Sequence, residues 1–327
     1  MNRKFFIYVL FSITGLASLA QTFSLDKKAQ QQILNEAENW MDDMPEGLFD
    51  RLSDAVNHAQ HGFYSEIEYF RNAADTVGIG KYKVNIKDIN GGKSEDIPMR
   101  LYSSYSNSIK PLLIYFHGGG WTMGSIQTVD KFCRALASEG KVNVVSVSYP
   151  LAPEKPYPLG LNKCVEAVEF IKNNISLFES SQDKINLGGD GAGGNLALET
   201  FQKLPGNISI KSLVLFYPLI QKSGNLDPKS KKEYGRGYGF DSRLWEAYIS
   251  AYQNNSDYYA SSKSLPPTLI ISPGKDIIIE EVKNFSLSDS NITLLEFDNA
   301  LHGFITDGHQ HTAFSKAVEF TNLFLSH

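Results

Sequence analysis

This chain of 327 residues is poor in cysteine and contains no run of basic residues. Its only two cysteines, Cys133 and Cys164, fall on different expected helices with a strand between them, so we expect two buried thiols and no disulfide. Acidic residues outnumber basic ones by 36 to 31, and no aromatic-basic patch occurs, which argues against nucleic acid as a partner. Internal repeats and low-complexity tracts are absent as well.

Long apolar stretches are also scarce, and the most extended one lies at the N-terminus. A basic stretch at residues 2–4, an apolar stretch at 5–16 and small residues at 18 and 20 predict a secretory signal peptide cleaved near Ala20. Polar breaks make this stretch short for a bilayer span, so we expect an exported protein, periplasmic or secreted, with no stable membrane anchor. Cleavage would remove Arg3 and Lys4, leaving 29 basic residues against 36 acidic ones.

Three helical patterns come first, and the remainder of the chain alternates strands with helices. The patterns between residues 24 and 74 predict N-terminal cap helices within 21–75, the first of them capped by Ser24. Residues 76–327 predict an α/β domain with a mostly parallel sheet and helices on both faces. The expected strands lie at 81–86, 97–102, 112–116, 142–147, 213–217, 267–271 and 293–297, with a further strand beginning at 185.

The interval at about 220–263 interrupts this alternation. It is polar and contains glycines and many aromatic residues. An insertion of this length inside a compact domain is usually a lid or a binding segment, and we expect it to belong to the cap. An aromatic packing layer without any ligand is an equal alternative.

The centre of the chain carries Gly189-Asp190-Gly191-Ala192-Gly193 between an apolar strand pattern and a helix pattern. Many hydrolases place a nucleophilic serine at such a corner, within G-x-S-x-G. Here Gly191 occupies the serine position. Glycine lacks a hydroxyl, so an acyl-enzyme cannot form at this position. Glycine also tolerates the strained backbone of such a corner, and we therefore predict that Gly191→Ser slightly lowers thermal stability.

Three more motifs follow expected strand ends, where ligands bind in open α/β sheets. The stretch HGGGW at residues 117–121 leaves backbone N–H groups unshielded, which suits stabilisation of a developing oxyanion. Asp276 and His302 each come just after a strand. The order of corner, aspartate and histidine is that of the triad partners in α/β hydrolases.

The chain resembles the hormone-sensitive-lipase family of α/β hydrolases, which includes many bacterial carboxylesterases. The resemblance covers roughly residue 75 to the end and rests on five motifs in the correct order: HGGGW from 117, YPLAPEKPYP from 149, GDGAGGN from 189, LPPTLIISPGKD from 265 and HGF from 302. Gly191 in place of serine and Pro150 in place of a usual arginine depart from the family pattern.

The resemblance assigns each functional position. It makes His302 the general base and Asp276 its orienting acid, and it forms an oxyanion hole from the N–H groups of Gly119, Gly120 and Ala192. It implies a small or aromatic carboxylic ester, or an acyl or aryl ligand, and neither a metal nor an organic cofactor. It says nothing of the oligomeric state.

Several hypotheses remain open for the substituted corner. One hypothesis is a hydrolase scaffold without acyl-enzyme turnover. Two others are a slow hydrolase in which His302 activates water and a receptor-like binding protein. A substitute nucleophile at Thr122 or Ser125 is a further alternative.

The substitution of the corner also creates G-x-G-x-x-G at 189–194, the dinucleotide fingerprint. That fingerprint needs an acidic residue about 20 positions on. Residues 208–219 contain none, so we interpret the match as coincidental.

Overall fold

The computed structural model describes residues 23–74, 82–94, 96–106, 108–220, 226–253, 264–306 and 308–326. The expected signal peptide at 1–20 lies outside these ranges, as do residues 221–225 and 254–263 of the expected cap insertion. Across the described ranges, no helix is both long and apolar enough to cross a membrane.

The described chain folds around an eight-stranded sheet with the order β1-β2-β4-β3-β5-β6-β7-β8. All neighbouring strands from β4 to β8 run parallel, whereas β1 and β2 pair antiparallel and β2 pairs antiparallel with β4. This confirms the predicted α/β hydrolase fold. The strands are β1 (Asn85–Gly91), β2 (Ile97–Ser103), β3 (Leu112–Phe116), β4 (Asn143–Val147), β5 (Ile185–Asp190), β6 (Ser212–Phe216), β7 (Thr268–Lys275) and β8 (Ile292–Leu301).

The first strand corrects a sequence prediction. We expected it at 81–86, but β1 begins at Asn85 and pairs with β2 as far as Gly91 opposite Ile97. The side chains of β1 are mostly exposed at the sheet edge, so their alternation carries little information about burial. Pairing across the hairpin, and not the local pattern, therefore sets the limits of this strand.

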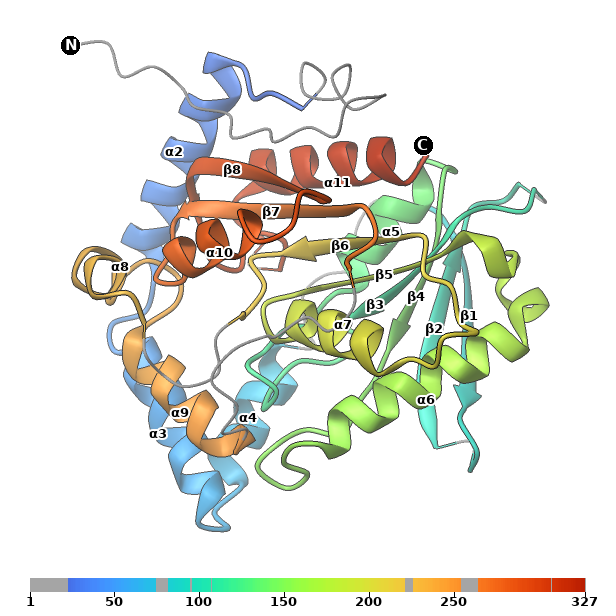
Figure 1. Ribbon diagram of the computed structural model, residues 1–327. Coiled ribbons are helices and arrows are strands. Elements are labelled where there is room, and N and C mark those ends of the chain that lie inside the picture. The colour runs from blue at the N-terminus through green and yellow to red at the C-terminus, as the bar shows by residue number, and fades with distance from the viewer. Residues whose placement is uncertain are drawn as a thin grey trace.

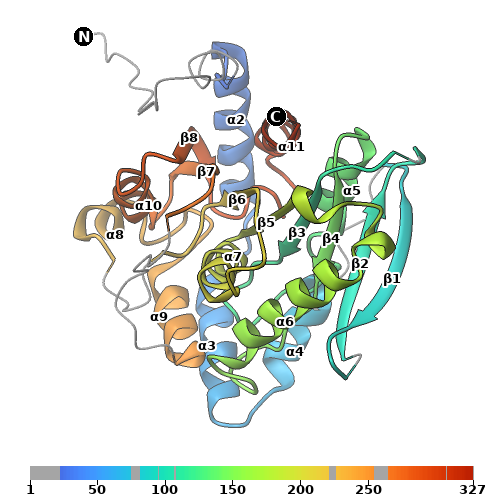
Figure 2. The same ribbon diagram turned by 45° about the vertical axis from the view of Figure 1, so that its right-hand side comes forward.

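Helices cover both faces of the sheet (Figures 1 and 2). One face carries α6 (Leu159–Asn173), α7 (Ala192–Lys203) and α10 (Ile279–Ser286), and the other carries α5 (Asp130–Ser138) and α11 (His311–Leu325). Every residue of β3, β4, β5 and β6 is buried, as expected for strands covered on both sides. Cys133 in α5 and Cys164 in α6 are buried and free, which confirms the predicted pair of thiols.

The remaining helices are α2 (Lys27–Asp43), α3 (Leu48–Gln60), α4 (Ser65–Ala74), α8 (Pro228–Tyr234) and α9 (Ser242–Tyr252). Helix α3 packs against α4 and α9, so the N-terminal helices and the insertion meet at one end of the molecule (Figure 2). Helix α2 instead packs along β8 and α11. Its N-cap is Asp26 and not Ser24, because the Asp26 carboxylate reaches the N–H of Ala29 at 2.7 Å.

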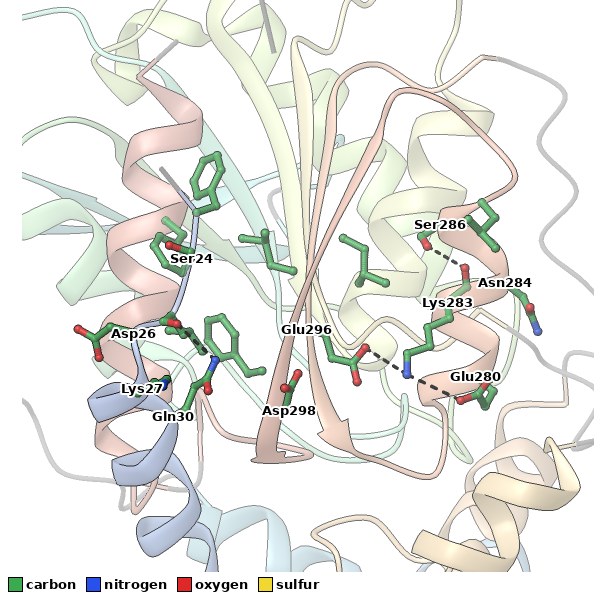
Figure 3. A pocket seen from close by; sticks show the side chains of 17 residues that line it. Ser24, Asp26, Lys27, Gln30, Glu280, Lys283, Asn284, Ser286, Glu296 and Asp298 are labelled. Carbon is green, nitrogen blue, oxygen red and sulfur yellow. Dashed lines mark hydrogen bonds and ion pairs between the residues drawn. The ribbon is translucent and has the colours of Figure 1, made fainter. Parts of the chain in front are cut away.

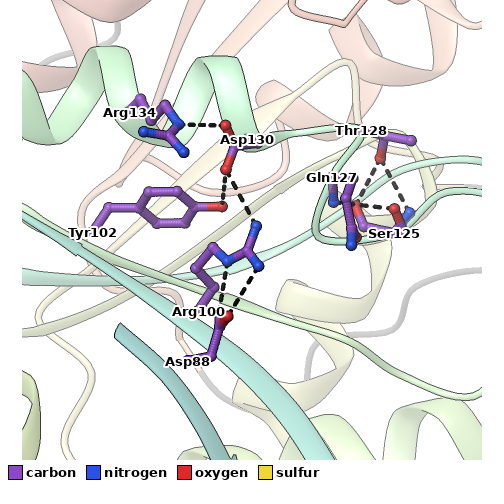
Figure 4. Close-up of polar contacts among 8 residues, drawn as sticks. All are labelled: Asp88, Arg100, Tyr102, Ser125, Gln127, Thr128, Asp130 and Arg134. Carbon is purple, nitrogen blue, oxygen red and sulfur yellow. Dashed lines mark hydrogen bonds and ion pairs between the residues drawn. The ribbon is translucent and has the colours of Figure 1, made fainter. Parts of the chain in front are cut away.

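A charged network ties α5 to the antiparallel edge of the sheet (Figure 4). The buried Asp130 carboxylate accepts a hydrogen bond from Tyr102 Oη at 3.0 Å and forms ion pairs with Arg134 and Arg100. Arg100 also binds Asp88 of β1 at 2.6 Å. Burial is the main cause of the raised pKa of Tyr102. Because a buried carboxylate is costly unless it is paired, this network fixes the start of α5.

Candidate active site

Gly191 forms the corner between β5 and α7. Its backbone lies at φ 50° and ψ −115°, in a region that non-glycine residues rarely adopt. The corner is held by its own backbone, since the N–H of Gly191 donates to Phe216 O at 2.9 Å and its carbonyl accepts from Leu219 N at 3.1 Å. A β-carbon on Gly193 would collide with the carbonyl of Phe116, so the start of α7 lies directly against the end of β3.

Asp276 and His302 form a hydrogen-bonded pair beside this corner. Asp276 follows β7, His302 follows β8, and the distance from Asp276 Oδ2 to His302 Nδ1 is 2.7 Å. The Asp276 side chain is fully buried, and its other oxygen accepts from Ile278 N at 3.2 Å. The His302 side chain is 14% exposed. With Nδ1–H directed to the carboxylate, the neutral ring presents Nε2 as a proton acceptor.

Nε2 of His302 faces the corner. A β-carbon built on Gly191 would lie 3.8 Å from His302 Nε2. A hydroxyl on that carbon would stand within hydrogen-bond reach of the ring, which is the arrangement of an activated nucleophile and its base. The structure thus brings together positions 191, 276 and 302 as the sequence predicted.

The glycines after β3 form a tight loop. Gly119 and Gly120 have φ values of 106° and 59°, and a β-carbon on Gly119 would collide with the carbonyl of Met123. Within the described chain, the N–H groups of Gly119, Gly120 and Ala192 donate to no protein acceptor. Because β3 and β5 are adjacent parallel strands, these donors lie at the same end of the sheet, as an oxyanion hole requires.

The Asp190 side chain holds this loop by a hydrogen bond to its backbone. Its Oδ1 accepts hydrogen bonds from Gly118 N at 2.9 Å and from Tyr115 Oη at 3.0 Å. The carboxyl is buried, and desolvation raises its pKa to about 6, against the opposing effect of these two hydrogen bonds. A β-carbon on Gly118 would collide with this carboxylate, so the loop and Asp190 are in close contact.

Two further contacts hold the loop from the side, and sequence reasoning missed both. Tyr149 stacks on His117 with ring centroids 4.3 Å apart and donates to His117 O at 2.7 Å. Arg71 of α4 donates to Thr122 O at 2.9 Å and to Ala152 O at 3.2 Å, and it binds both carboxylate oxygens of Glu154. Tyr149 lies in a motif that carried the resemblance, whereas no pattern around Arg71 indicates its partners.

Three aromatic side chains lie directly over this corner. The ring centroids of Phe240 and His302 are 4.5 Å apart, and the Tyr217 ring, just after β6, lies 4.6 Å from the His302 ring. A β-carbon on Gly120 would collide with the ring of Tyr248. The sequence shows that 220–263 is rich in aromatic residues, but it does not show which residues their rings contact. These contacts place the aromatic segment over His302 and over the glycine loop after β3.

The suggested substitute nucleophiles stand elsewhere. The Thr122 carbonyl is bound by Arg71, and its hydroxyl points to Gly119 O at 3.5 Å. The Ser125 hydroxyl accepts from Gln127 N at 3.0 Å within the turn that precedes α5 (Figure 4). Neither residue lies at the strand-to-helix corner. No cluster of histidine, cysteine, aspartate or glutamate side chains suited to a metal ion occurs in the ranges that the structure describes.

Comparisons with known proteins agree with this geometry. The family model of the alpha/beta hydrolase fold matches residues 113–306, more than half of the chain. The chain is 28% identical over 226 residues to an arylesterase of Saccharolobus solfataricus, covering 64% of this chain and 73% of that protein. It is 26% identical over 245 residues to the carboxylic ester hydrolase LipN of Mycobacterium tuberculosis, covering 68% of this chain and 65% of that protein.

Solved structures show the same fold. A hyperthermophilic esterase from the archaeon Pyrobaculum calidifontis superposes with a TM-score of 0.71 at 23% identity, covering 86% of this chain and 100% of that one. At this identity, the likeness establishes the architecture and not the activity.

Proposed function

The chain belongs to the family of the α/β hydrolase fold, and we propose that it is a carboxylesterase-type member whose acyl-enzyme turnover is lost or very weak. One observation carries this proposal: Gly191 occupies the nucleophile corner opposite His302 Nε2, and it has no hydroxyl. The hydrogen-bonded Asp276–His302 pair and the three N–H donors support the view that the rest of the machinery is retained.

The proposed ligand is a small carboxylic ester or a related acyl or aryl compound. Two relatives, described as an arylesterase and as a carboxylic ester hydrolase, favour an ester ligand of this kind. The aromatic rings of Phe240 and Tyr248 next to the site are consistent with a compact apolar ligand. In such a site the acyl oxygen would lie toward the N–H groups of Gly119, Gly120 and Ala192.

A paired assay on 4-nitrophenyl acetate and butyrate tests the proposal. We expect Gly191→Ser to raise kcat/KM by about 10³-fold or more over the chain as it stands, because the acyl-enzyme route reopens. Gly191→Ala is the matched control, since it introduces the same β-carbon without a hydroxyl, and it should stay inactive. A folded Gly191→Ser that remained inactive would show that the retained machinery is not competent.

The intact Asp276–His302 pair also favours a second function, slow hydrolysis by water that His302 activates. Hydrolases without a complete triad keep roughly 10³–10⁴-fold acceleration over water. This route predicts measurable turnover without the serine that His302→Ala abolishes. If both the native chain and Gly191→Ser are inactive but bind the ester saturably, a receptor-like role is favoured instead.

A further inference from the structure

A cavity of about 670 Å³ lies away from the catalytic corner, around the outer edge of β8. It extends from α10 on one face of the sheet to the start of α2 and Phe320 of α11 on the other (Figure 3). Its volume is within the range of about 300–1,000 Å³ that is usual for small-molecule sites. Gly191, Asp276 and His302 are not among its lining residues, so this cavity is separate from the proposed ester site.

The apolar part of the cavity is held by aromatic packing. Phe23 and Phe320 contact each other edge to face at 5.4 Å, and Phe297 lies 6.1 Å from Phe320. All three rings are buried, which fixes this side of the cavity before any ligand arrives. Leu294 adds a partly exposed surface, and Leu287, which is 56% exposed, lines the α10 side. An apolar body would therefore cover surface that is now in contact with water.

The charged side chains of the cavity are unbalanced. Four carboxylates and two lysines line it: Asp26, Glu280, Glu296, Asp298, Lys27 and Lys283. Lys283 is already shared between Glu296 at 3.1 Å and Glu280 at 3.8 Å. The Asp26 carboxylate already accepts a hydrogen bond from the N–H of Ala29, because it caps the N-terminus of α2.

Asp298 forms no ion pair with any described residue. It lies between Gln30 of α2 and Glu296 of its own strand (Figure 3). In the part of the chain that the structure describes, no side chain hydrogen-bonds to it or forms an ion pair with it. The Asp298 side chain is exposed, and partial desolvation raises its pKa against the opposing effects of the Lys283 charge and of a hydrogen bond from its own backbone N–H. A cation bound at this position would form an ion pair with Asp298 that water partly screens.

We propose that this cavity binds a small amphiphilic organic cation, with a protonated amine against Asp298 and an apolar or aryl body against the phenylalanine and leucine side chains. A carboxylate ligand would meet the excess of negative charge. A neutral ligand would leave Asp298 without its partner. The proposal concerns a second site and does not depend on the function proposed for the catalytic corner.

Binding of three matched probes tests the site by calorimetry at neutral pH. The probes are 4-phenylbutylamine, the neutral 4-phenylbutanol and the anionic 4-phenylbutyrate. We expect the amine to bind about five-fold more tightly than the alcohol, as a partly exposed ion pair allows, and the carboxylate to bind most weakly. Asp298→Asn should remove the advantage of the amine and leave the affinity for the alcohol unchanged.

Three control variants locate the binding. Asp42→Asn removes an exposed carboxylate of α2 that does not line the cavity, and it should leave the affinity for the amine unchanged. Leu287→Ala should weaken the amine and the alcohol equally, because both lose the same apolar contact. His302→Ala should affect neither. Equal binding of amine and alcohol, an amine affinity unaltered by Asp298→Asn, or no saturable binding of the amine would overturn the proposal.

Discussion

A β-carbon placed on Gly191 would lie 3.8 Å from Nε2 of His302 and, among the described residues, would meet no other atom within 4 Å beyond its chain neighbours. The corner therefore has room for a serine side chain. What opposes the substitution is the backbone, since φ at Gly191 is 50°. The chemical and the conformational effects of this one position can thus be measured separately.

We predict that Gly191→Ser lowers the free energy of unfolding by about 1 kcal/mol, because a side chain at this positive φ is strained where glycine is not. Gly191→Ala should cost about the same, since the strain arises at the β-carbon. Urea denaturation of the three proteins gives the comparison. A serine variant more stable than the native chain would contradict the strain argument.

In the Gly191→Ser background, Asp276→Asn should reduce kcat by about 10³–10⁴-fold, as loss of the orienting carboxylate does in serine hydrolases. The reason is the 2.7 Å contact to His302 Nδ1, which holds the ring so that Nε2 faces the corner. Asp42→Asn in the same background is the control and should leave kcat unchanged. Circular dichroism must show that both variants are folded. A small effect of Asp276→Asn would mean that His302 is oriented by other contacts.

Asp190 predicts a specific pH dependence of stability. Desolvation raises its pKa to about 6 in the fold, above the value near 3.9 of an unfolded chain. The native state therefore holds this proton more tightly, and the associated stability is present below pH 4 and is lost as the pH rises through 6. The loss is on the order of 2–3 kcal/mol.

Asp190→Asn should remove this component, because an amide does not titrate while its oxygen can still accept from Gly118 N and Tyr115 Oη. The measurement is the free energy of unfolding of both proteins between pH 4 and 7.5. As the pH rises across this interval, the unfolding free energy of the asparagine variant should increase relative to that of the native chain. A constant difference would exclude a raised pKa at Asp190.

Arg71 should couple α4 to the glycine loop at residues 118–124. Its guanidinium joins α4 to Thr122 O and to the Glu154 carboxylate. Burial is the largest single effect on the pKa of Glu154 and raises it, but the Arg71 hydrogen bond, a backbone hydrogen bond and the Arg71 charge together lower the pKa on balance. We predict that Arg71→Met lowers the free energy of unfolding by about 1–2 kcal/mol. This is less than the loss expected for a fully buried ion pair, because the side chains of Arg71 and Glu154 are partly exposed. Hydrogen exchange at residues 118–124 should become faster.

Arg51→Met on α3 is the matched control for this experiment, and it should change neither quantity. Arg71→Lys should restore only part of the effect, since a lysine cannot reach several acceptors with the fixed fork of a guanidinium. Unchanged exchange in Arg71→Met would show that the loop is held without this residue.

Some features of this protein follow from local patterns and from the order of motifs along the chain. Apolar runs alternating with helical patterns indicated the parallel sheet, and the corner, Asp276 and His302 each followed a strand. Parallel strands end at one edge of the sheet, so these residues had to meet there once the strand order was correct. The absence of a hydroxyl at Gly191 is likewise a property of the sequence alone.

Tertiary structure alone decided the contacts between distant segments. Arg71 meets Glu154 across 83 positions of the chain, and Phe240 lies on His302 although nothing in either segment indicates the other. The cavity beside Asp298 also exists only because α2, α10 and α11 converge on β8. The physical reason is that hydrophobic periodicity encodes which face of an element is buried, whereas the partner of each side chain depends on how the faces pack.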